Sequence, residues 1–544
     1  WRPPYFFSGT DDIDASGGGA PQAHVLRRAF EELGLSGILC QDNGPIIYFR
    51  AMERLDASHV LALHRTFWNQ GVAPILVLIG PDEVHIYSGL SQPGVDHAPG
   101  AEPDGLVERL DRVADQLRAF LVAVETGEYY HRHRRAFDPR QRVDRNLLRH
   151  LEAARELLAE VPAGRLDPVS LDALLCRIVF TCYLFDRKVI DRKYLEDAGI
   201  EGVEGLADIL GRKPRSRAKA DLYTLFSQLG QDFNGDLFSE DLDAEAGQVR
   251  AEHLDILGDF IRGTDPRSGQ QRFWPYQFGI IPIETISAIY EHFLKAAGEQ
   301  EKKESGAFYT PRFLAELVID SALDGEGSLL GKRFLDPACG SGIFLVGLFN
   351  RLAEEWVRAN PAANYDAKLK GLTAILKNNL YGVDKNRTAC LIAAFSLYLA
   401  FLDQLSPPDI RRVLKKVKVL PRLVAGEENG EATIRCADFF TDVAAPTRQV
   451  DFVIGNPPWA KVRDASAPAA TWCARRKLPF PGKQIAAAFI WKATEHLTPE
   501  GSVCFVLPHG LLFNHTKSAV EFQSHWFRSH AVERILNLAD FQRF

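Results

Sequence analysis

The chain has 544 residues, 46% of them hydrophobic and 25% charged, which is long enough for three or more ordinary globular domains. No apolar run reaches the length of a membrane span, and the first residues lack the pattern of a signal peptide. The eight cysteines include no Cys-x-x-Cys pair, which favours reduced thiols in a cytoplasm and offers no zinc-binding spacing. The net charge of -7 does not by itself indicate a nucleic-acid-binding protein.

Residues 1–95 are predicted to form a small α/β domain. Short apolar segments rich in β-branched and aromatic residues alternate there with turns, which is typical of strands. The predicted strands are 36–40, 46–49, 74–79 and 84–87. Residues 96–300 are predicted to form a helical connector, in which 170–189 is a long amphipathic helix.

Three clusters of basic residues stand out against the acidic whole. They are 131–135, 212–219 and 411–416. Each could contact the phosphates of a nucleic acid, but taken singly each is expected to be the solvated face of a helix, which is the commoner role of such a cluster.

Three strand ends in the second half carry residues suited to a nucleotide. Segment 334–342, Phe-Leu-Asp-Pro-Ala-Cys-Gly-Ser-Gly, predicts a strand that enters a glycine turn before an apolar helix, an arrangement that favours a carboxylate or phosphate. Strand 380–384 ends in Asp384, whose carboxylate suits the two hydroxyls of a ribose. Strand 432–436 precedes Asp438 and Phe439, which suit the amino group and the face of an adenine. The long helical stretch before Asp384 argues against NAD, whose acid follows the glycines by about 20 residues.

The most informative segment is 451–459, Asp-Phe-Val-Ile-Gly-Asn-Pro-Pro-Trp. Its apolar part predicts a buried strand, and the two prolines end the strand in a rigid turn at its carboxyl end. Asn456 Oδ1 and the Pro457 carbonyl can each accept a hydrogen bond from an exocyclic amine, and Trp459 can stack on the ring that bears it. Taken alone, these residues could also be an ordinary turn at the end of a strand, with Trp459 buried and without a catalytic role.

Taken in order, these motifs resemble those of the gamma-class adenine-N6 DNA methyltransferases, which use S-adenosylmethionine (SAM). Segments 306–311, 483–489 and 501–508 are similar to the family's first motif and to the helix and strand that follow its catalytic tetrad. The resemblance covers residues 305–510 and points to the methylase portion of type IIG (Eco57I-like) restriction-modification and phage-defence (BREX/DISARM-like) enzymes. The SAM-binding residues that it implies are Phe308, Tyr309, Thr310, Pro311, Asp336, Pro337, Ala338, Cys339, Gly340, Ser341, Gly342, Asp384, Asp438 and Phe439. The catalytic tetrad that it implies is Asn456, Pro457, Pro458 and Trp459.

The resemblance implies an α/β, Rossmann-like SAM-dependent methyltransferase fold over residues 301–544, after the connector at 96–300 and the small domain at 1–95. It implies direct in-line transfer of the methyl group of SAM to N6 of an adenine flipped out of double-stranded DNA. It also implies a cytoplasmic, nucleoid-associated protein of bacteria or archaea, with other defence-system subunits as partners, and with no metal and no membrane contact.

The chain departs from the family pattern at several places. Many members carry an acid in place of Asn456 and Tyr in place of Trp459, but Asn keeps an acceptor and Trp keeps a stacking surface. The Ala/Arg-rich segment 465–477 is either a loop over the target base or solvated surface, and we expect surface. The chain has no Pro-Cys pair for carbon-5 cytosine methylation, and Cys339 is expected to be a small packed residue.

Two alternatives remain from the residues. The same Asn-Pro-Pro-aromatic motif occurs in enzymes that methylate RNA or a protein amide, and a catalytically silent DNA-binding scaffold would keep the same fold. No Glu-x-Lys lies on a predicted N-terminal strand, so we expect no nuclease activity there, with a degenerate nuclease fold left open. Segment 534–541 is expected to be a late strand of the catalytic sheet, and the C-terminal target-recognition part of the family is not identified in this chain.

Overall fold

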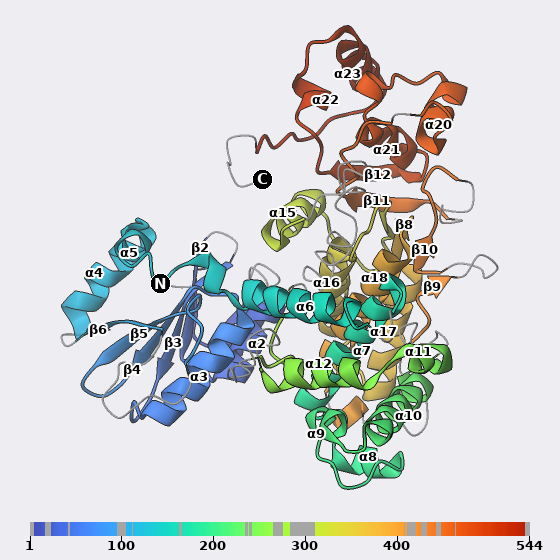
Figure 1. The fold of residues 1–544 in the computed structure, drawn as a ribbon. Coiled ribbons are helices and arrows are strands. Elements are labelled where there is room, and N and C mark those ends of the chain that lie inside the picture. Colours follow the sequence, from blue (N-terminus) through green and yellow to red (C-terminus); the bar gives the residue numbers. More distant parts are fainter. Residues whose placement is uncertain are drawn as a thin grey trace. The chain divides into compact units, whose positions relative to one another are not determined.

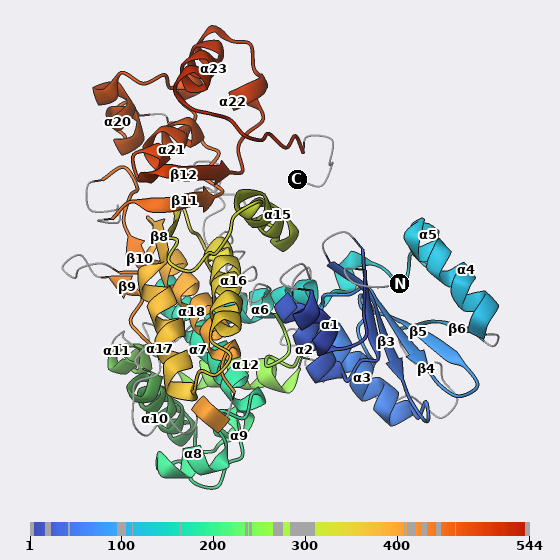
Figure 2. The ribbon, with the colours of Figure 1, turned by 180° about the vertical axis from the view of Figure 1, so that it is seen from behind.

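Two six-stranded sheets organise the described part of the chain in the computed structural model (Figures 1 and 2). The structure describes residues 5–16, 23–41, 44–94, 105–110, 113–162, 166–233, 238, 242–264, 276–282, 285, 310–406, 408–410, 420–425, 432–441, 448–462 and 464–538. The chain divides into two compact units, the first with residues 1–167, 178–225 and 243–285, and the second with 168–177, 226–242 and 286–544.

The sheet of the first unit follows chain order. Its strands are β1 (Phe6–Phe7), β2 (Gly37–Gln41), β3 (Gly44–Ala51), β4 (Ile75–Ile79), β5 (Val84–Ser88) and β6 (Leu106–Leu110). Strands β3 and β4 are parallel and are joined through α3 (Ala57–Gln70), whereas the other neighbours are antiparallel. The four strands expected from the sequence are confirmed, and β1 and β6 extend the sheet on both sides. Alternate side chains enter two different apolar clusters, so the sheet is buried on both faces.

The middle of the chain is helical, as expected. Besides α1 (Thr10–Ala15) and α2 (Ala23–Leu33), the helices are α4 (Val113–Glu125), α5 (Glu128–Arg132), η1 (Pro139–Gln141), α6 (Val143–Ala159), α7 (Pro168–Asp186), α8 (Arg192–Asp197), α9 (Leu206–Gly211), α10 (Arg215–Phe233), α11 (Leu242–Gln248) and α12 (Ala251–Arg262). The expectation that 170–189 is amphipathic is wrong. Residues 171–184 are all buried, because α7 carries apolar residues on every side and such a helix needs contacts on every side. Even the guanidinium of Arg177 is fully buried, 5.9 Å from the ring centroid of Phe226.

The sheet of the second unit is entirely parallel within the described residues. Its strands lie in the order β12 (Leu497–Phe505), β11 (Val450–Gly455), β7 (Phe334–Asp336), β8 (Leu380–Asp384), β10 (Ile434–Cys436) and β9 (Val424–Ala425). The chain starts at the central β7, builds β8, β9 and β10 on one side, and then returns to place β11 and β12 on the other. The strand order therefore reverses between β7 and β11, which is where open α/β sheets bind ligands.

Helices cover both faces of this sheet. On one face, a Cβ built on Gly382 would point toward Leu345 of α16 (Ile343–Ala359). Helix α16 packs against α17 (Tyr365–Asn378) and α18 (Arg387–Asp403). Leu335, Tyr381 and Val453 point instead into an apolar cluster with α20 (Pro468–Arg476) and α21 (Ile485–Thr494). The remaining elements are α15 (Arg312–Leu323), η3 (Pro481–Lys483), α22 (Gly510–Phe513) and α23 (Lys517–Ser529). The expected α/β, Rossmann-like fold is confirmed.

The expectation of a late strand at 534–541 is wrong for the part that the structure describes. Residues 531–538 form no strand, and Ile535 and Leu536 are 46% and 51% exposed. An apolar segment becomes a strand only where a neighbouring strand pairs with its backbone, and among the described residues β12 pairs with β11 alone.

We expect the stability of the protein to fall as the pH drops below about 6.5. Burial, aided by the nearby ammonium of Lys492, lowers the pKa of His496 from 6.5 to about 4. The unfolded chain then binds a proton between these two pH values whereas the folded chain does not, so acid favours unfolding. The free energy of unfolding should decrease by on the order of 1–2 kcal/mol between pH 7 and pH 5. Urea unfolding of the protein and of His496→Phe tests this, since an equal pH dependence in both would exclude His496 as the cause.

Candidate active site

The glycine turn after β7 can be built only with glycine at its end. Gly342 has φ +84° and is the N-cap of α16, and a Cβ there would lie 3.0 Å from the Cβ of Ala393. Gly340 also has a positive φ of 52°. The turn is tied to β8 by a hydrogen bond from the backbone N–H of Cys339 to the carbonyl of Val383 at 2.9 Å. Glycine at position 342 thus lets the start of α16 pack closely against α18, and the N-terminus of a helix favours a carboxylate or phosphate.

Asp384 connects the glycine turn after β7 with the turn that follows β8. Its carboxylate accepts hydrogen bonds from the backbone N–H of Gly340 at 3.0 Å and of Asn386 at 2.8 Å. Burial raises the pKa of Asp384, while these two hydrogen bonds lower it. Asn386 in turn caps α18 by accepting from the N–H of Ala389 at 3.1 Å. The carboxylate is therefore oriented before any ligand binds.

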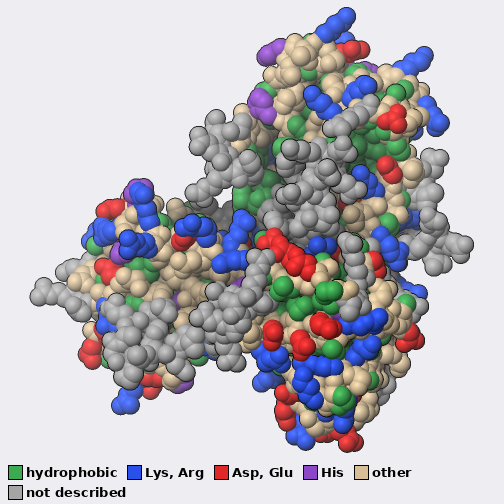
Figure 3. Space-filling view, in the orientation of Figure 1, with side chains coloured by type: hydrophobic (Ala, Val, Ile, Leu, Met, Phe, Trp, Pro, Cys, Tyr) green, Lys and Arg blue, Asp and Glu red, His purple; other side chains and the backbone are tan. Residues whose placement is uncertain are grey.

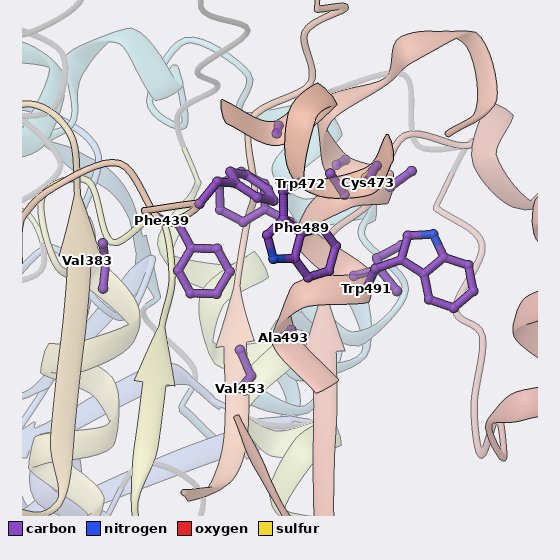
Figure 4. Close-up of a cluster of buried hydrophobic side chains, with 14 of the residues drawn as sticks. Val383, Phe439, Val453, Trp472, Cys473, Phe489, Trp491 and Ala493 are labelled. Atoms are coloured by element: carbon purple, nitrogen blue, oxygen red, sulfur yellow. The ribbon is translucent and has the colours of Figure 1, made fainter. Parts of the chain in front are cut away.

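Asp438 and Phe439 follow β10, the strand next to β8. Asp438 is half-buried, and its Oδ1 accepts a hydrogen bond from the N–H of Phe440 at 2.9 Å. Phe439 is only 3% exposed, and its ring stacks on that of Phe489 with a centroid distance of 5.3 Å (Figure 4). The ammonium of the buried Lys492 lies 5.2 Å from the centroid of Phe439. The structure thus places this ring inside the apolar cluster, so its contact with the adenine of SAM stays a prediction.

The Asn-Pro-Pro-Trp segment leaves β11 directly beside the end of β7. A Cβ on Gly455 would lie 2.7 Å from Oδ1 of Asp336, a buried carboxylate oxygen that accepts from the N–H of Ala338 at 3.1 Å. The sequence analysis gave no role to Gly455, although a glycine immediately before Asn-Pro-Pro is a signal of close backbone approach. On the other side, the N–H of Val506 donates to the carbonyl of Gly455 at 3.0 Å. The two loops at the switch point are in contact.

The side chain of Asn456 is held at one end only. Its Nδ2 donates to Oγ1 of Thr310 at 3.1 Å, and Thr310 is 4% exposed. Its Oδ1 is buried and has no hydrogen-bond partner among the described residues. Pro457 is buried, Pro458 and Trp459 are half-buried, and the indole N–H of Trp459 points to the carbonyl of Val506 at 3.4 Å. A buried acceptor without a donor is costly, which indicates that a ligand supplies the donor.

The other predicted site residues lie on the same edge of the sheet or outside the described residues. Pro311 is the N-cap of α15, and Ser341 and Cys339 are buried in the glycine turn. Burial raises the pKa of the Cys339 thiol, in agreement with a packed residue. Phe308 and Tyr309 lie outside the described residues. Within the described ranges, no group of three or more His, Cys, Asp or Glu could hold a metal, and no helix has the length and apolarity needed to cross a membrane.

The segment 465–477 is not simply solvated surface, so that expectation is wrong in part. It contains α20, whose Trp472 and Cys473 are buried in the apolar cluster. Arg476 covers the ring of Trp472, with its guanidinium carbon 4.3 Å from the centroid, and forms an ion pair with Glu495 at 2.6 Å. One face of the helix carries apolar residues that the composition of the segment concealed.

Two family models match the chain in overlapping stretches. Residues 282–405 match the N-6 DNA Methylase model, and residues 378–544 match the Eco57I restriction-modification methylase model. The Type I restriction enzyme MjaIX methylase subunit of Methanocaldococcus jannaschii is 27% identical over 42% of this chain and 33% of its own length. The Type II restriction enzyme and methyltransferase RM.Eco57I of Escherichia coli is 22% identical over 50% of this chain and 31% of its own length. The adenine-specific methyltransferase PglX of Streptomyces coelicolor is 26% identical over 41% of this chain and 19% of its own length.

The chain therefore spans about a third or less of the length of these curated relatives. Both family models match its second half, where the glycine turn, Asp384 and the Asn-Pro-Pro-Trp segment meet at one sheet edge. Through residues 282–544, the chain matches the N-6 DNA Methylase and Eco57I restriction-modification methylase families.

Proposed function

We propose that the chain transfers a methyl group from SAM to N6 of an adenine flipped out of double-stranded DNA, in a restriction-modification or phage-defence system. One observation carries the proposal: Asn456 Oδ1 is a buried acceptor without a partner among the described residues. It lies on the loop that touches the end of β7, where the glycine turn begins. An exocyclic amine is the kind of group that satisfies such an acceptor.

The residues at the carboxyl ends of β7, β8 and β10 fit SAM. The turn at Gly340 and Gly342 leads into the N-terminus of α16, which suits the carboxylate of the methionine part, and the oriented carboxylate of Asp384 suits the ribose hydroxyls. Asp438, at the next strand end, retains the predicted role of contacting the adenine amino group. When bound, SAM supplies an activated methyl group on its sulfonium.

The tetrad would act by positioning the amine. Asn456 Oδ1 and the Pro457 carbonyl each accept one N–H of the N6 amino group, which turns the nitrogen lone pair away from both acceptors and toward the methyl donor. Trp459 stacks on the extruded base and offsets part of the cost of unstacking it. Neither acceptor is basic, so the surplus proton passes to solvent. Alignment of this kind can supply about 7–11 kcal/mol of the reduction in the barrier.

A basic face in the first unit supports DNA as the partner. Residues 127–149 contain seven arginines against three acids, and all seven arginines are exposed. The three acids are already used, because Glu128, Asp138 and Asp144 pair with Arg132, Arg140 and Arg142. Arg134, Arg135, Arg145 and Arg149 have no ion pair within the described residues. Lys and Arg side chains gather in Figure 3 over the region where Figure 1 labels α5.

The cluster at 212–219 differs from this basic face, because most of its cations already have partners within the fold. In 212–219, Arg212 pairs with Asp221, Arg215 pairs with Asp255, and Lys219 donates to the carbonyls of Ala246 and Val249. That cluster is largely neutralised inside the fold, and 411–416 lies outside the described residues. Of the clusters described, only 131–135 with its continuation to Arg149 keeps several cations available for phosphates.

Removal of two of these cations should weaken DNA binding without affecting SAM binding. For Arg134→Gln/Arg135→Gln we expect duplex affinity to fall roughly 5- to 10-fold, and the slope of log affinity against log salt to decrease by about 2, since each phosphate contact contributes about 0.9. The matched control is Lys213→Gln/Arg217→Gln, which removes two exposed cations from the neutralised cluster. Fluorescence anisotropy over a salt series measures both, and an equal loss in the two variants would contradict a specific role for the face.

The proposed reaction is tested by following where the methyl group goes. The purified protein is incubated with isotope-labelled SAM and, in parallel, with unmethylated duplex DNA, structured RNA and a protein extract. We expect label in the DNA alone. Label in RNA or in protein would identify that molecule, instead of DNA, as the substrate. SAM binding without transfer to any of the three would indicate a catalytically silent scaffold.

A further inference from the structure

An exposed pair of aromatic rings lies directly after β12. The rings of His509 and Phe513 stack on each other, with a centroid distance of 4.6 Å and an angle of 15° between their planes. Both residues are exposed, Phe513 by 42%. The backbone N–H of Phe513 donates to the carbonyl of His509 at 3.1 Å, so the two residues are one helical turn apart on one face of α22. We call this pair the ring platform.

The opposite face of α22 is anchored in the fold. Leu511 is 3% exposed and belongs to the apolar cluster that α20 and α21 also enter, and Leu512 packs against the same cluster. The side-chain amide of Gln523 donates to the carbonyls of Leu511 at 3.2 Å and of Asn514 at 3.0 Å. The ring platform is therefore held in place before it binds a partner, which reduces the entropy lost on binding.

The ring platform follows the same edge of the sheet as the Asn-Pro-Pro-Trp segment. Strand β12 is parallel to its neighbour β11, so their carboxyl ends lie side by side. The N–H of Val506 donates to the carbonyl of Gly455 at 3.0 Å, and the carbonyl of Val506 lies 3.4 Å from the indole nitrogen of Trp459. His509 is three residues further along, so its Cα lies at most about 11 Å from that of Val506. Because successive bases of a strand are about 3.4 Å apart, the platform is within a few bases of one that stacks on Trp459.

The chain around the ring platform is poor in acids. Residues 505–530 contain one acid, Glu521, against Lys517, Arg528 and four histidines. Lys517 and His515, which follow α22 directly, are exposed. Exposed aromatic rings among basic side chains are typical of surfaces that stack on bases while the cations attract the phosphates. The charge and the rings together favour a nucleic acid as the partner of this surface.

We propose that the ring platform stacks on a base that becomes exposed in DNA when the target adenine is extruded. The inference rests on the proposed function and deepens it, because it names a second contact with the opened duplex. In an intact duplex the bases are stacked on both faces and offer no surface to a ring. Extrusion of one base uncovers the faces of its two neighbours and leaves the opposite base unpaired. A ring that covers one of these faces stabilises the open state.

Matched DNA probes test the ring platform without any methyl transfer. The probes are an intact duplex and the same duplex with one abasic site, which leaves base faces uncovered. For His509→Ala/Phe513→Leu we expect the affinity for the abasic duplex to fall about 10-fold, because stacking on an aromatic ring contributes roughly this factor per base. The affinity for the intact duplex should change less than about twofold, and the salt dependence of both should be unchanged, since the rings contact no phosphate. Fluorescence anisotropy measures these affinities, and the melting temperature should stay the same because neither ring is buried.

Two controls separate stacking from other effects. Phe513→Tyr keeps the ring and should retain the affinity for the abasic duplex, whereas Phe513→Leu alone keeps apolar surface and should not. Equal affinities of these two variants would indicate a purely apolar contact, as with a protein partner, and would overturn the inference. Phe527→Leu removes another exposed ring of the same unit, on α23, and should change neither affinity. An equal loss on the intact and abasic duplexes, or no loss on either, would also overturn the inference.

The result is distinguishable from the outcome of the proposed reaction. If the protein methylates DNA but the double variant binds the abasic duplex normally, the ring platform is rejected and the proposed function stands. If the affinity falls as expected but no methyl group is transferred to DNA, the proposed reaction is rejected and the base-stacking surface stands.

Discussion

Asn456→Ala is expected to reduce the rate of methyl transfer at least about 100-fold and to leave the affinity for SAM within about twofold. The substitution removes the buried acceptor Oδ1, whereas Asp384 and the glycine turn keep the hydrogen bonds that orient them. An amine that is bound by one acceptor instead of two loses the alignment of its lone pair, and misalignment of this size costs about 100-fold or more. Single-turnover kinetics with labelled SAM gives the rate, and calorimetry gives the affinity.

Trp459→Phe is the control in the same segment. It keeps a stacking ring and removes the long contact of the indole N–H with Val506 at 3.4 Å, so a decrease of less than about 10-fold is expected. A loss of SAM binding in Asn456→Ala comparable to its loss of rate would contradict the account, since Asn456 would then support the glycine turn and not the base.

Gly455→Ala is expected to damage the SAM site and the tetrad together. The added Cβ would lie 2.7 Å from Oδ1 of Asp336, a distance that real Cβ contacts essentially never show, and Asp336 is only 1% exposed. Either the β7 loop or the β11 loop must move, and overpacking of this kind costs about 1–3 kcal/mol. We expect the affinity for SAM to fall at least about 10-fold and the rate at least about 100-fold, with a lower melting temperature.

Gly327→Ala is the matched control in the same unit. Apart from its two chain neighbours, no described residue has a heavy atom within 4 Å of a Cβ at that glycine, so SAM affinity, rate and melting temperature should be unchanged. Full activity in Gly455→Ala would show that the two loops do not need their close approach, and the switch-point assignment would lose its main geometric support.

Much of the fold follows from local patterns in the sequence. Each apolar run of strand type in the first 95 residues became a strand, and the runs that end at Asp384 and Asn456 lie in one parallel sheet. These predictions succeed because burial of alternate or continuous apolar side chains is a local requirement. The strand predicted at 534–541 is not observed in the described residues. A strand also requires a neighbouring strand to pair with, and the sequence of the segment does not specify one.

The geometry of the site depends on contacts that local patterns do not encode. Thr310 and Asn456 are 146 residues apart, and no spacing rule relates them. The stacking of Phe439 on Phe489, which lies on a helix 50 residues further along, is likewise not encoded in the local pattern around Phe439. The burial of residues 171–184 of α7 likewise depends on neighbours, because the partners that cover Asp172, Arg177 and Thr181 are not specified by the sequence of the helix itself.

The most direct test of the central claim identifies the methylated atom. The protein and its Asn456→Ala variant are incubated with isotope-labelled SAM and unmethylated genomic DNA, and the DNA is digested and analysed as nucleosides by mass spectrometry. The account predicts labelled N6-methyladenine with the protein and at most about 1% of that amount with the variant. Label in a methylated cytosine, or equal label in the two samples, would contradict it.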